Sequence, residues 1–452
     1  MIPHARVRMA QWVFVIVAVW SMHIDVVMAD VSPDVQRRVE VCIDSQMEHW
    51  IGFYRTAHAN PELSNDEVES ATRVADAFFA AGLEITREVG GHGVVGVIRN
   101  GEGPVVLIRG DMDALPITEE TGLPFASNKK VTRTDGTRTG VMHACGHDVH
   151  QTVLIATARS LSMLRDHWRG TVIFVAQPAE EIGQGARRMI EDGLFTKFPK
   201  PQDCIALHCA ADLPAGKIGY TSGWALANVD SVDITIHGRG GHGAYPHKAI
   251  DPIVAGSQVV LALQTIVSRR IDPRESAVVT VGSFHAGTKH NVIPDSATLQ
   301  LTVRSYGDDS RRKLLDSIRQ IATDTCKAAG CETPPDVKVI ETDFTPATFN
   351  DPALSQAAAE ALRASVGADN VVELPPVMGG EDFGRFAPAV GGRGFMFWLG
   401  VVGADRYATS QKPGAAPLPP LHSSKLQVDP EPTIRTGVKA MTCLALSLLD
   451  AS

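Results

Sequence analysis

Short apolar segments alternate with helical segments through the first half of the chain, and this alternation restricts the possible folds more than any other feature. Four apolar segments have the pattern of buried strands: residues 94–98, 105–109, 171–176 and 204–207. Helical patterns separate several of them, around residues 149–165 and 183–192. Strands that are apolar along their whole length are typical of parallel sheets covered by helices on both faces. The alternation therefore predicts an α/β domain with a mostly parallel central sheet.

A second pattern, over residues 229–341, interrupts this domain. Apolar and polar residues alternate in two of its predicted strands, as expected for strands with one exposed face. Asp251 and Pro252 provide a favourable start for a helix. The predicted elements are a strand at 232–237, a helix at 251–268, strands at 277–284 and 297–304, a helix at 308–329 and a strand at 336–341. This βαββαβ order is that of a ferredoxin-like α+β sandwich, so we expect an inserted domain that splits the first one.

Composition and charge exclude several classes of protein. Of the 452 residues, 44% are hydrophobic and 21% are charged, as in a globular chain of two or three domains. There are 42 Lys and Arg against 51 Asp and Glu, a net charge of −9, and no block is rich in Lys or Arg. Nucleic-acid-binding proteins need a basic face, so we expect no nucleic-acid partner. No apolar run reaches the ~20 residues of a spanning helix, which excludes a polytopic membrane protein.

The N-terminal segment has the features of a secretory signal peptide. Arg6 and Arg8 precede an apolar run at residues 12–20, and the small residue Ala29 follows. We expect cleavage after Ala29 and export, so that the mature chain is secreted or periplasmic and has no membrane anchor. An uncleaved anchor is the alternative.

Side chains that bind metals or transfer protons follow three of the predicted strands. In strand order they are Asp111 with Asp113, Glu180 with Glu181, and His208. A further cluster, MHACGHD at residues 142–148, lies between the first two of these strands. Because the carboxyl ends of parallel strands lie at one edge of a sheet, we expect these side chains to converge.

The types of residue that converge indicate a metal site. Imidazole, thiolate and carboxylate ligands together suit zinc or a similar divalent ion. They outnumber the four ligands of one tetrahedral site, and two ions that share Cys145 or a carboxylate would use them. Glu180 and Glu181 are adjacent, so one can bind metal while the other accepts a proton from water, as in metal-assisted hydrolysis.

Three other chemistries fit the sequence less well. Cys145 could be a covalent nucleophile, but the glutamate pair and the downstream histidines favour metal ligation. Residues 238–243 match the dinucleotide fingerprint G-x-G-x-x-G, but Pro246 comes before any helix and no acidic residue stands ~20 positions downstream. The sequence also lacks the H-E-x-x-H motif of zincins and the G-x-S-x-G motif of serine hydrolases.

Six motifs occur in the order found in one known family. They are RGDMDALP (109–116), MHACGHD (142–148), QPAEE (177–181), GGHGAYPH (240–247), NVIPD (291–295) and GGEDF (379–383). With these motifs, the chain resembles the hippurate hydrolase and indoleacetyl-amino-acid hydrolase group of metal-dependent amidohydrolases. That group lies within the aminoacylase/carboxypeptidase superfamily. The resemblance covers essentially the whole mature chain, and the motifs are specific as a set.

The resemblance implies a dinuclear metal centre and a role for each site residue. The implied metal ligands are Cys145, His147, Glu181, His208 and His422. Glu180 would be the general base that takes a proton from a water bridging the two ions, and Asp113 would orient the ligands. His242 and Asn291 would hold the oxyanion, reaching in from a partner subunit, and Arg304 would bind the free carboxylate of the substrate. The thiolate favours zinc, with manganese, cobalt and nickel as alternatives.

Pattern and resemblance together give a domain plan and an expected activity. The plan has a signal peptide at 1–29, a catalytic domain at 30–222 and 342–452, and a lid or dimerisation domain at 223–341. The expected activity is hydrolysis of the amide bond of N-acyl amino acids, often with an aromatic acyl group, by a homodimer or larger homo-oligomer. A dipeptidase or carboxypeptidase using the same site on short peptides is the nearest alternative. A non-catalytic ligand-binding relative is the alternative of another class.

Overall fold

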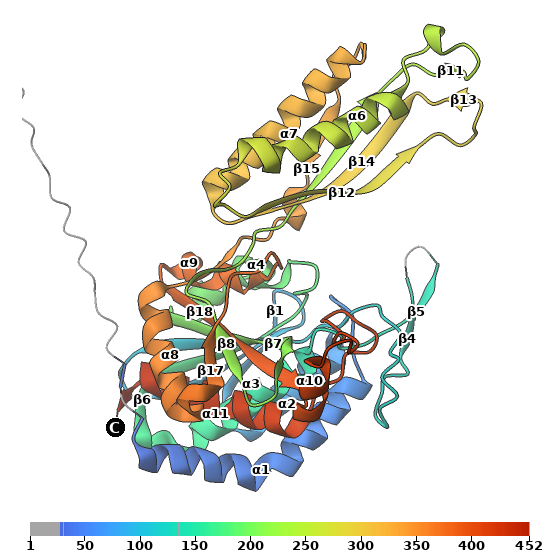
Figure 1. The fold of residues 1–452 in the computed structure, drawn as a ribbon. Coiled ribbons are helices and arrows are strands. Elements are labelled where there is room, and N and C mark those ends of the chain that lie inside the picture. Colours follow the sequence, from blue (N-terminus) through green and yellow to red (C-terminus); the bar gives the residue numbers. More distant parts are fainter. Residues whose placement is uncertain (1–27, 30, 134–135, 452) are drawn as a thin grey trace, which may run out of the picture.

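The computed structural model describes residues 28–29, 31–133 and 136–451, and these form a larger and a smaller unit (Figure 1). Residues 1–27, which contain most of the predicted signal peptide, lie outside the described residues. Within the described ranges, no helix combines the length and the apolar character needed to cross a membrane. The two ends of the described chain belong to the larger unit, and the middle of the chain forms the smaller one.

The larger unit is built on one long mixed sheet. Its strands lie in the order β1 (Glu84–Val89), β2 (Gly93–Asn100), β6 (Trp168–Gln177), β3 (Val105–Asp111), β7 (Asp203–Pro214), β18 (Arg393–Val402), β8 (Ile218–Tyr220) and β17 (Val371–Glu373). The short strand β19 (Asp450–Ala451) pairs with β6. The neighbouring strands β6, β3, β7 and β18 run parallel, whereas the pairs β1–β2, β2–β6 and β18–β8 are antiparallel. The predicted α/β fold with a mostly parallel central sheet is confirmed.

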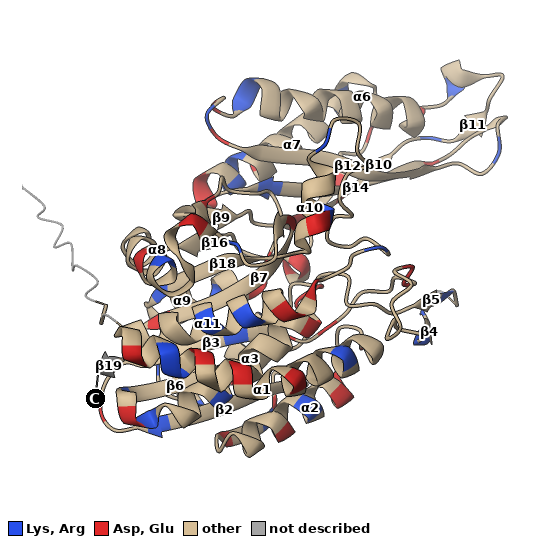
Figure 2. Ribbon diagram, turned by 60° about the horizontal axis from the view of Figure 1, so that its bottom comes forward, with Lys and Arg blue, Asp and Glu red and all other residues tan. Residues whose placement is uncertain are grey.

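Helices cover both faces of this sheet. One face packs on α1 (Pro33–Ala59), α2 (Val68–Ala80), α3 (His147–Met163), α8 (Pro352–Val366) and α11 (Pro430–Leu448), and the other on α4 (Gly185–Glu191), α5 (Leu194–Lys197) and α9 (Phe386–Val390). In β3, Val106 and Ile108 belong to the first core and Leu107 to the second. Burial on both faces explains why the central strands are apolar throughout. The outer sides of α1 and α2 carry interspersed basic and acidic residues (Figure 2).

The smaller unit is an antiparallel sheet covered on one face by two helices. Its elements are β10 (Asp230–His237), α6 (Pro252–Thr265), β12 (Ala277–Ala286), β14 (Ser296–Ser305), α7 (Asp308–Ala328) and β15 (Asp336–Val339). The strands lie in the order β12-β14-β10-β15, and α6 packs against α7. Val232, Ile234 and Ile236 of β10 are buried beneath the helices, and the residues between them are more exposed. The elements thus follow the βαββαβ order expected from the sequence.

Short strand pairs lie at both ends of the smaller unit. Where the chain enters and leaves it, β9 (Gly223–Leu226) pairs with β16 (Thr348–Asn350). At the tip farthest from the larger unit, β11 (Gly241–His242) pairs with β13 (Val292–Ile293) (Figure 1). In the larger unit, β4 (Lys130–Thr132) and β5 (Arg138–Gly140) form a separate antiparallel pair, and α10 (Ala404–Ser410) precedes a proline-rich loop. The chain therefore enters and leaves the smaller unit at neighbouring positions.

Candidate metal centre

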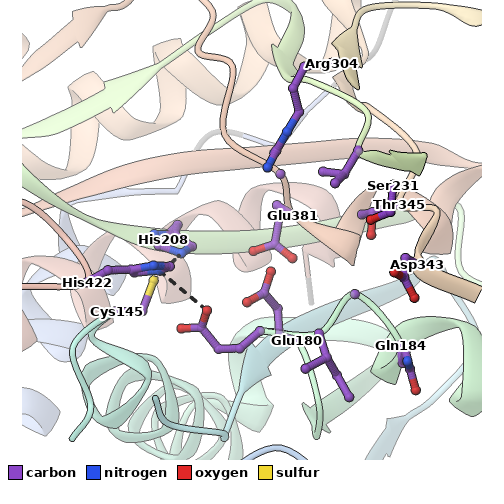
Figure 3. A pocket seen from close by; sticks show the side chains of 15 residues that line it. Cys145, Glu180, Gln184, His208, Ser231, Arg304, Asp343, Thr345, Glu381 and His422 are labelled. Atoms are coloured by element: carbon purple, nitrogen blue, oxygen red, sulfur yellow. Dashed lines mark hydrogen bonds and ion pairs between the residues drawn. The ribbon is translucent and has the colours of Figure 1, made fainter. Parts of the chain in front are cut away.

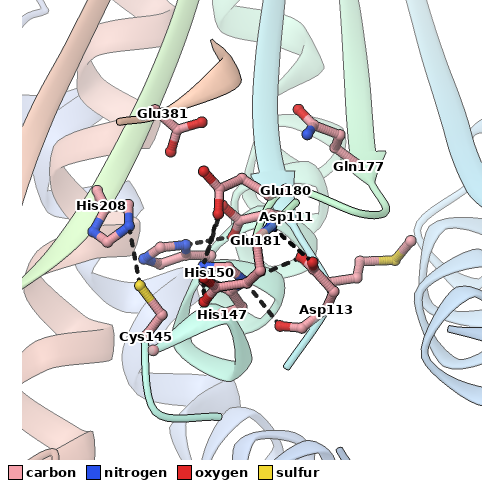
Figure 4. Close-up of polar contacts among 12 residues, drawn as sticks. Asp111, Asp113, Cys145, His147, His150, Gln177, Glu180, Glu181, His208 and Glu381 are labelled. Atoms are coloured by element: carbon pink, nitrogen blue, oxygen red, sulfur yellow. Dashed lines mark hydrogen bonds and ion pairs between the residues drawn. The ribbon is translucent and has the colours of Figure 1, made fainter. Parts of the chain in front are cut away.

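Four of the five side chains expected to bind metal, Cys145, His147, Glu181 and His208, meet at the carboxyl ends of the parallel strands (Figure 4). Asp111 is the last residue of β3, and Glu180 and Glu181 lie in the loop that follows β6. Cys145 lies just before α3, and His147 is the first residue of that helix. Strand ends and a helix start therefore bring separate sequence motifs to one edge of the sheet.

The strand that carries His208 is longer than predicted. The sequence pattern ends it at residue 207, but β7 continues to Pro214 because β18 pairs with it from Asp203 onward. His208 is therefore held inside a strand rather than in a loop after it. Trp398 is its register partner on β18, with the two ring centroids 5.5 Å apart.

Gly146 lets the loop before α3 pack against β7. Its φ of +84° lies in the left-handed region that favours glycine. A Cβ atom at this position would lie 2.7 Å from the sulfur of Cys209, which is closer than real Cβ contacts. The glycine between Cys145 and His147 therefore allows both side chains to approach His208.

The five side chains implied as metal ligands form two neighbouring groups of donor atoms. The donor atoms of Cys145, His147 and His208 lie within 4.8 Å of one another, and so do those of Cys145, Glu181 and His422. His208 Nε2 is 3.5 Å from Cys145 Sγ, and His422 Nε2 is 3.5 Å from Glu181 Oε2. Because Cys145 belongs to both groups, the arrangement suits two ions with a shared ligand.

The two buried histidines direct their Nε2 atoms at this cluster, which fits a metal. His147 Nδ1 lies 2.8 Å from the backbone oxygen of Asp113, and His208 Nδ1 lies 2.9 Å from that of Cys209. A carbonyl oxygen only accepts, so each Nδ1 carries a proton. Nε2 is then the atom of each ring that would bind a metal, in exchange for any proton on it. Among the described residues, His147 Nε2 and Glu181 Oε1 are buried without a hydrogen-bond partner.

Asp113 holds two of these side chains in place. Its Oδ2 accepts hydrogen bonds from Ser64 Oγ at 2.6 Å and from the backbone nitrogen of Glu181 at 2.9 Å. Its Oδ1 lies 3.3 Å from His147 Nδ1. Burial raises the pKa of this carboxyl group, but the contacts with His147, Ser64 and the backbone nitrogen of Glu181 outweigh burial and lower the pKa. These contacts connect Asp113 to two residues of the cluster, His147 and Glu181.

His422 approaches the cluster from the C-terminal part of the chain. Its φ of +65° is unusual for a residue other than glycine, and its backbone nitrogen donates to Ala144 O at 2.7 Å. This contact fixes the loop beside Cys145 and directs the ring towards Glu181. Its side chain is 54% exposed, in contrast to the buried His147 and His208.

Glu180 is buried beside the cluster in a strongly acidic environment. Its Oε2 lies 3.9 Å from His147 Nε2, and its carboxylate is grouped with those of Glu381 and Asp382. Burial and the negative charges of Glu381 and Glu181 raise the pKa of Glu180. A carboxylate with a raised pKa accepts a proton more readily, which is the property of a general base.

A buried network beneath Glu180 was not anticipated from the sequence. The Arg109 guanidinium lies 2.8 Å from Asp111 Oδ2 and 2.8 Å from Glu381 Oε1, and it also contacts Asp382 and Gln177. The motifs at 109–116 and 379–383 therefore meet in space. The sequence did contain a signal for this network. Arg109 lies at the end of an apolar strand, and an arginine buried there needs acidic partners.

His150 is another site residue that the sequence interpretation missed. It lies one helical turn after His147, and its Nδ1 is 2.5 Å from Asp111 Oδ1. Its Nε2 accepts from the backbone nitrogen of Cys209 at 2.9 Å. Both ring nitrogens are used, so His150 supports Asp111 and β7 rather than a metal.

A cavity of about 530 Å³ opens in front of the metal centre, between the two units (Figure 3). The smaller unit contributes Ser231 and Arg304 to its lining. The larger unit contributes Glu180 and four of the five expected ligands, namely Cys145, Glu181, His208 and His422. The Arg304 guanidinium contacts Thr302 Oγ1 and the oxygen of Met378. Within the described chain, no carboxylate forms an ion pair with it. This cation is therefore available to an acidic group in the cavity.

Two of the expected site residues lie away from this cavity in the same chain. His242 and Asn291 are exposed and belong to the β11–β13 tip of the smaller unit (Figure 1). The ring of His242 accepts a local hydrogen bond at Nδ1 from the nitrogen of Ala244 at 3.0 Å, which leaves Nε2 as the donor. The fold of one chain does not bring this donor to Glu180.

Comparisons with known proteins agree with these observations. The model of the peptidase family M20/M25/M40 matches residues 107–416. Thermostable carboxypeptidase 2 of Saccharolobus solfataricus is 37% identical over 408 residues, covering 89% of this chain and 96% of that protein. Hippurate hydrolase of Campylobacter jejuni is 39% identical over 334 residues, covering 73% of this chain and 82% of that protein.

A solved structure shares the fold. It is a dinuclear metal binding peptidase of the M20 family from Bacillus subtilis, 32% identical in sequence. The match covers 90% of this chain and 99% of the other, with a TM-score of 0.73.

Proposed function

The chain belongs to the M20/M25/M40 peptidase family, and on that basis we propose that it hydrolyses N-acyl amino acids. Membership confirms the resemblance inferred from the six motifs and makes the protein a metal-dependent hydrolase of amide bonds. The observation that carries the narrower proposal is Arg304, a cation without an acidic partner among the described residues, which faces the same cavity as Glu180. A substrate with a free carboxylate beside its amide bond would use both.

The donor set suits two divalent ions, with zinc favoured by the thiolate and manganese, cobalt or nickel as alternatives. The residues that would hold them are Cys145, His147, Glu181, His208 and His422. When bound, such ions polarise the substrate carbonyl and make water more acidic. Asp113 keeps His147 and Glu181 oriented through the contacts described above.

The chain's own groups account for binding and proton transfer. The guanidinium of Arg304 would bind the free carboxylate of the substrate through paired hydrogen bonds. Glu180 would take a proton from the attacking water as the oxygen bonds to the carbonyl carbon. It would then pass that proton to the nitrogen of the leaving amino acid as the C–N bond breaks.

The function is tested with a panel of N-benzoyl, N-acetyl and N-indoleacetyl amino acids and dipeptides, each assayed with zinc, manganese, cobalt and nickel. We expect turnover of N-acyl amino acids to exceed that of dipeptides. Faster cleavage of dipeptides would favour the second candidate, a dipeptidase or carboxypeptidase, which the Saccharolobus relative suggests. A metal-loaded protein that cleaves no amide would contradict both.

His242 and Asn291 would act on the active site of a partner subunit in a homodimer. Their exposure at the β11–β13 tip supports this arrangement, because both side chains carry donors for an oxyanion and neither lines the cavity of its own chain. Exposed apolar residues on α6, among them Val254 and Leu261, supply a surface that a partner would cover.

Mixing two inactive variants tests this arrangement. His242→Ala and Glu180→Gln should each be inactive as pure proteins, and an equal mixture after subunit exchange should recover about a quarter of native activity, since about half of the dimers are mixed and each has one complete site. The measurement is the rate of N-benzoylglycine hydrolysis, with each variant alone as the control. Activity that does not recover, although mixed dimers form, would show that His242 acts within its own chain or not at all.

Export remains part of the proposal. Arg6, Arg8 and the apolar run at residues 12–20 support a signal peptide, and the enzyme would then be secreted or periplasmic. Cell fractionation with an antibody against the chain tests this, and N-terminal sequencing of the exported protein would locate the cleavage site.

A further inference from the structure

Helix α7 of the smaller unit ends in a turn that brings two cysteines together. Cys326 lies in its last turn, and the chain reverses at Gly330, whose φ of +85° is in the left-handed region. The backbone nitrogen of Cys331 donates to Cys326 O at 2.9 Å. That of Gly330 donates to Lys327 O at 3.1 Å. These two hydrogen bonds define a Schellman motif, in which the side chains at the positions of Cys326 and Cys331 commonly contact each other.

The two thiols of this turn interact with each other. Cys326 is 1% exposed and belongs to the core of the smaller unit, and Cys331 packs against the same core. Their side chains form a hydrogen bond, and burial together with this contact raises the pKa of Cys326 to about 12. Of the seven cysteines, all of them within the described residues, Cys331 alone is partly exposed. The pair therefore has one sulfur open to a reagent in solution and a second sulfur next to it.

Another pair of cysteines has the same spacing and a different geometry. Cys204 and Cys209 are also five positions apart, but both lie in strand β7. Residues an odd number of positions apart in a strand point to opposite faces of the sheet, and Cys204 and Cys209 accordingly belong to the cores on opposite faces. At ~3.3 Å per residue their Cα atoms are about 16 Å apart, whereas a disulfide needs less than about 7 Å. The fold, and not the spacing, therefore distinguishes the two pairs.

We propose that Cys326 and Cys331 form a disulfide bond in the folded protein, whereas Cys204 remains a thiol. The bond would join the end of α7 to the segment that leads into β15, which is an edge strand of the sheet in the smaller unit. This inference does not depend on the proposed activity. It agrees with the proposed export, because disulfides form and persist in oxidising compartments.

The bond would form by thiol–disulfide exchange, with a small-molecule or protein disulfide as the oxidant. The thiolate of Cys331 attacks one sulfur of the oxidant, whose other sulfur leaves as a thiolate, and a mixed disulfide results. The thiolate of Cys326 then attacks the sulfur of Cys331 and releases the second thiolate. The two cysteines lose two protons and two electrons, and the oxidant becomes two thiols.

The test treats the reduced, folded and zinc-loaded protein with oxidised glutathione at about pH 8.5, near the ordinary pKa of a cysteine thiol. The reaction is stopped with acid, and the remaining thiols are alkylated in denaturant. We expect the number of alkylated cysteines to fall from seven to five. Trypsin cleaves after Lys and Arg, so residues 320–327 and 328–338 should be recovered as one linked pair of peptides. Cys204 and Cys209 are the matched control, and both should be alkylated.

Two variants test the order of the two attacks. Cys326→Ser should stop at the mixed disulfide and retain one glutathione on Cys331. Cys331→Ser should keep all six remaining thiols, because the other cysteines are buried. In the native protein, three results would overturn the inference: seven alkylated cysteines, a glutathione that stays on Cys331, or a link between Cys204 and Cys209. The native protein alone gives these three readings, so they hold even if a variant does not fold.

Discussion

Replacement of Glu180 by Gln is expected to lower kcat by ~10²–10⁴-fold, the usual contribution of a general base. The amide has the same shape as the carboxylate but cannot accept the proton of the attacking water. Metal content should not change, because the cluster of Cys145, His147, Glu181, His208 and His422 supplies the donors. The thermal midpoint should not fall, since the substitution removes one negative charge from a buried group that also contains Glu381 and Asp382. Steady-state kinetics, elemental analysis and thermal unfolding measure the three quantities.

Glu191→Gln is the matched control for this variant. It makes the same chemical change at an exposed position at the end of α4 and should leave kcat unchanged. Unchanged turnover in Glu180→Gln would end the assignment of Glu180 as the base. A parallel loss of metal would mean instead that Glu180 is a ligand.

Replacement of Arg109 by Met is expected to destabilise the folded protein by ~3–5 kcal/mol, the cost of removing one partner from a buried ion pair. Arg109 is 1% exposed and contacts Asp111, Glu381 and Asp382. Without the guanidinium, these buried carboxylates would repel one another with no compensating cation. Met fills a similar volume, so the loss reports on charge more than on packing. Urea denaturation followed by circular dichroism measures the free energy of unfolding.

Arg435→Gln provides the comparison. Arg435 lies on α11 and pairs with the exposed Asp44 and Glu431, an arrangement worth ~0–1 kcal/mol. We expect this variant to unfold close to the native midpoint. Similar losses for Arg109→Met and Arg435→Gln would refute the role of burial in the Arg109 network.

The architecture was predictable from the sequence because periodicity reports burial directly. The strands and helices of the smaller unit follow from alternating residues and from the helix start at Asp251, which are local signals. The length of β7 was not predictable, because its last residues extend only through pairing with β18, nearly two hundred positions later in the chain. Pairing partners at that distance leave little trace in a local pattern.

Some residues of the candidate site were also predictable from the sequence, and others were not. Cys145, His147, Glu180 and Glu181 were predictable, because they lie in compact motifs next to predicted strand ends. The contact of Arg109 with Glu381 was not, because it joins residues 272 positions apart and depends on how two loops pack. The distance of His242 from the cavity also depends on the relative position of the two units.

The pairing of β9 with β16 has a mechanical consequence. The chain enters and leaves the smaller unit through hydrogen-bonded neighbours, so its two covalent connections lie side by side. A rotation of the smaller unit about these two connections would change the distance between Arg304 and Glu180, because the two residues lie in different units. A substrate that contacts Arg304 and Glu180 at the same time would therefore connect the two units. The distance between the carboxylate and the amide of the substrate would then set the angle between the two units in the complex.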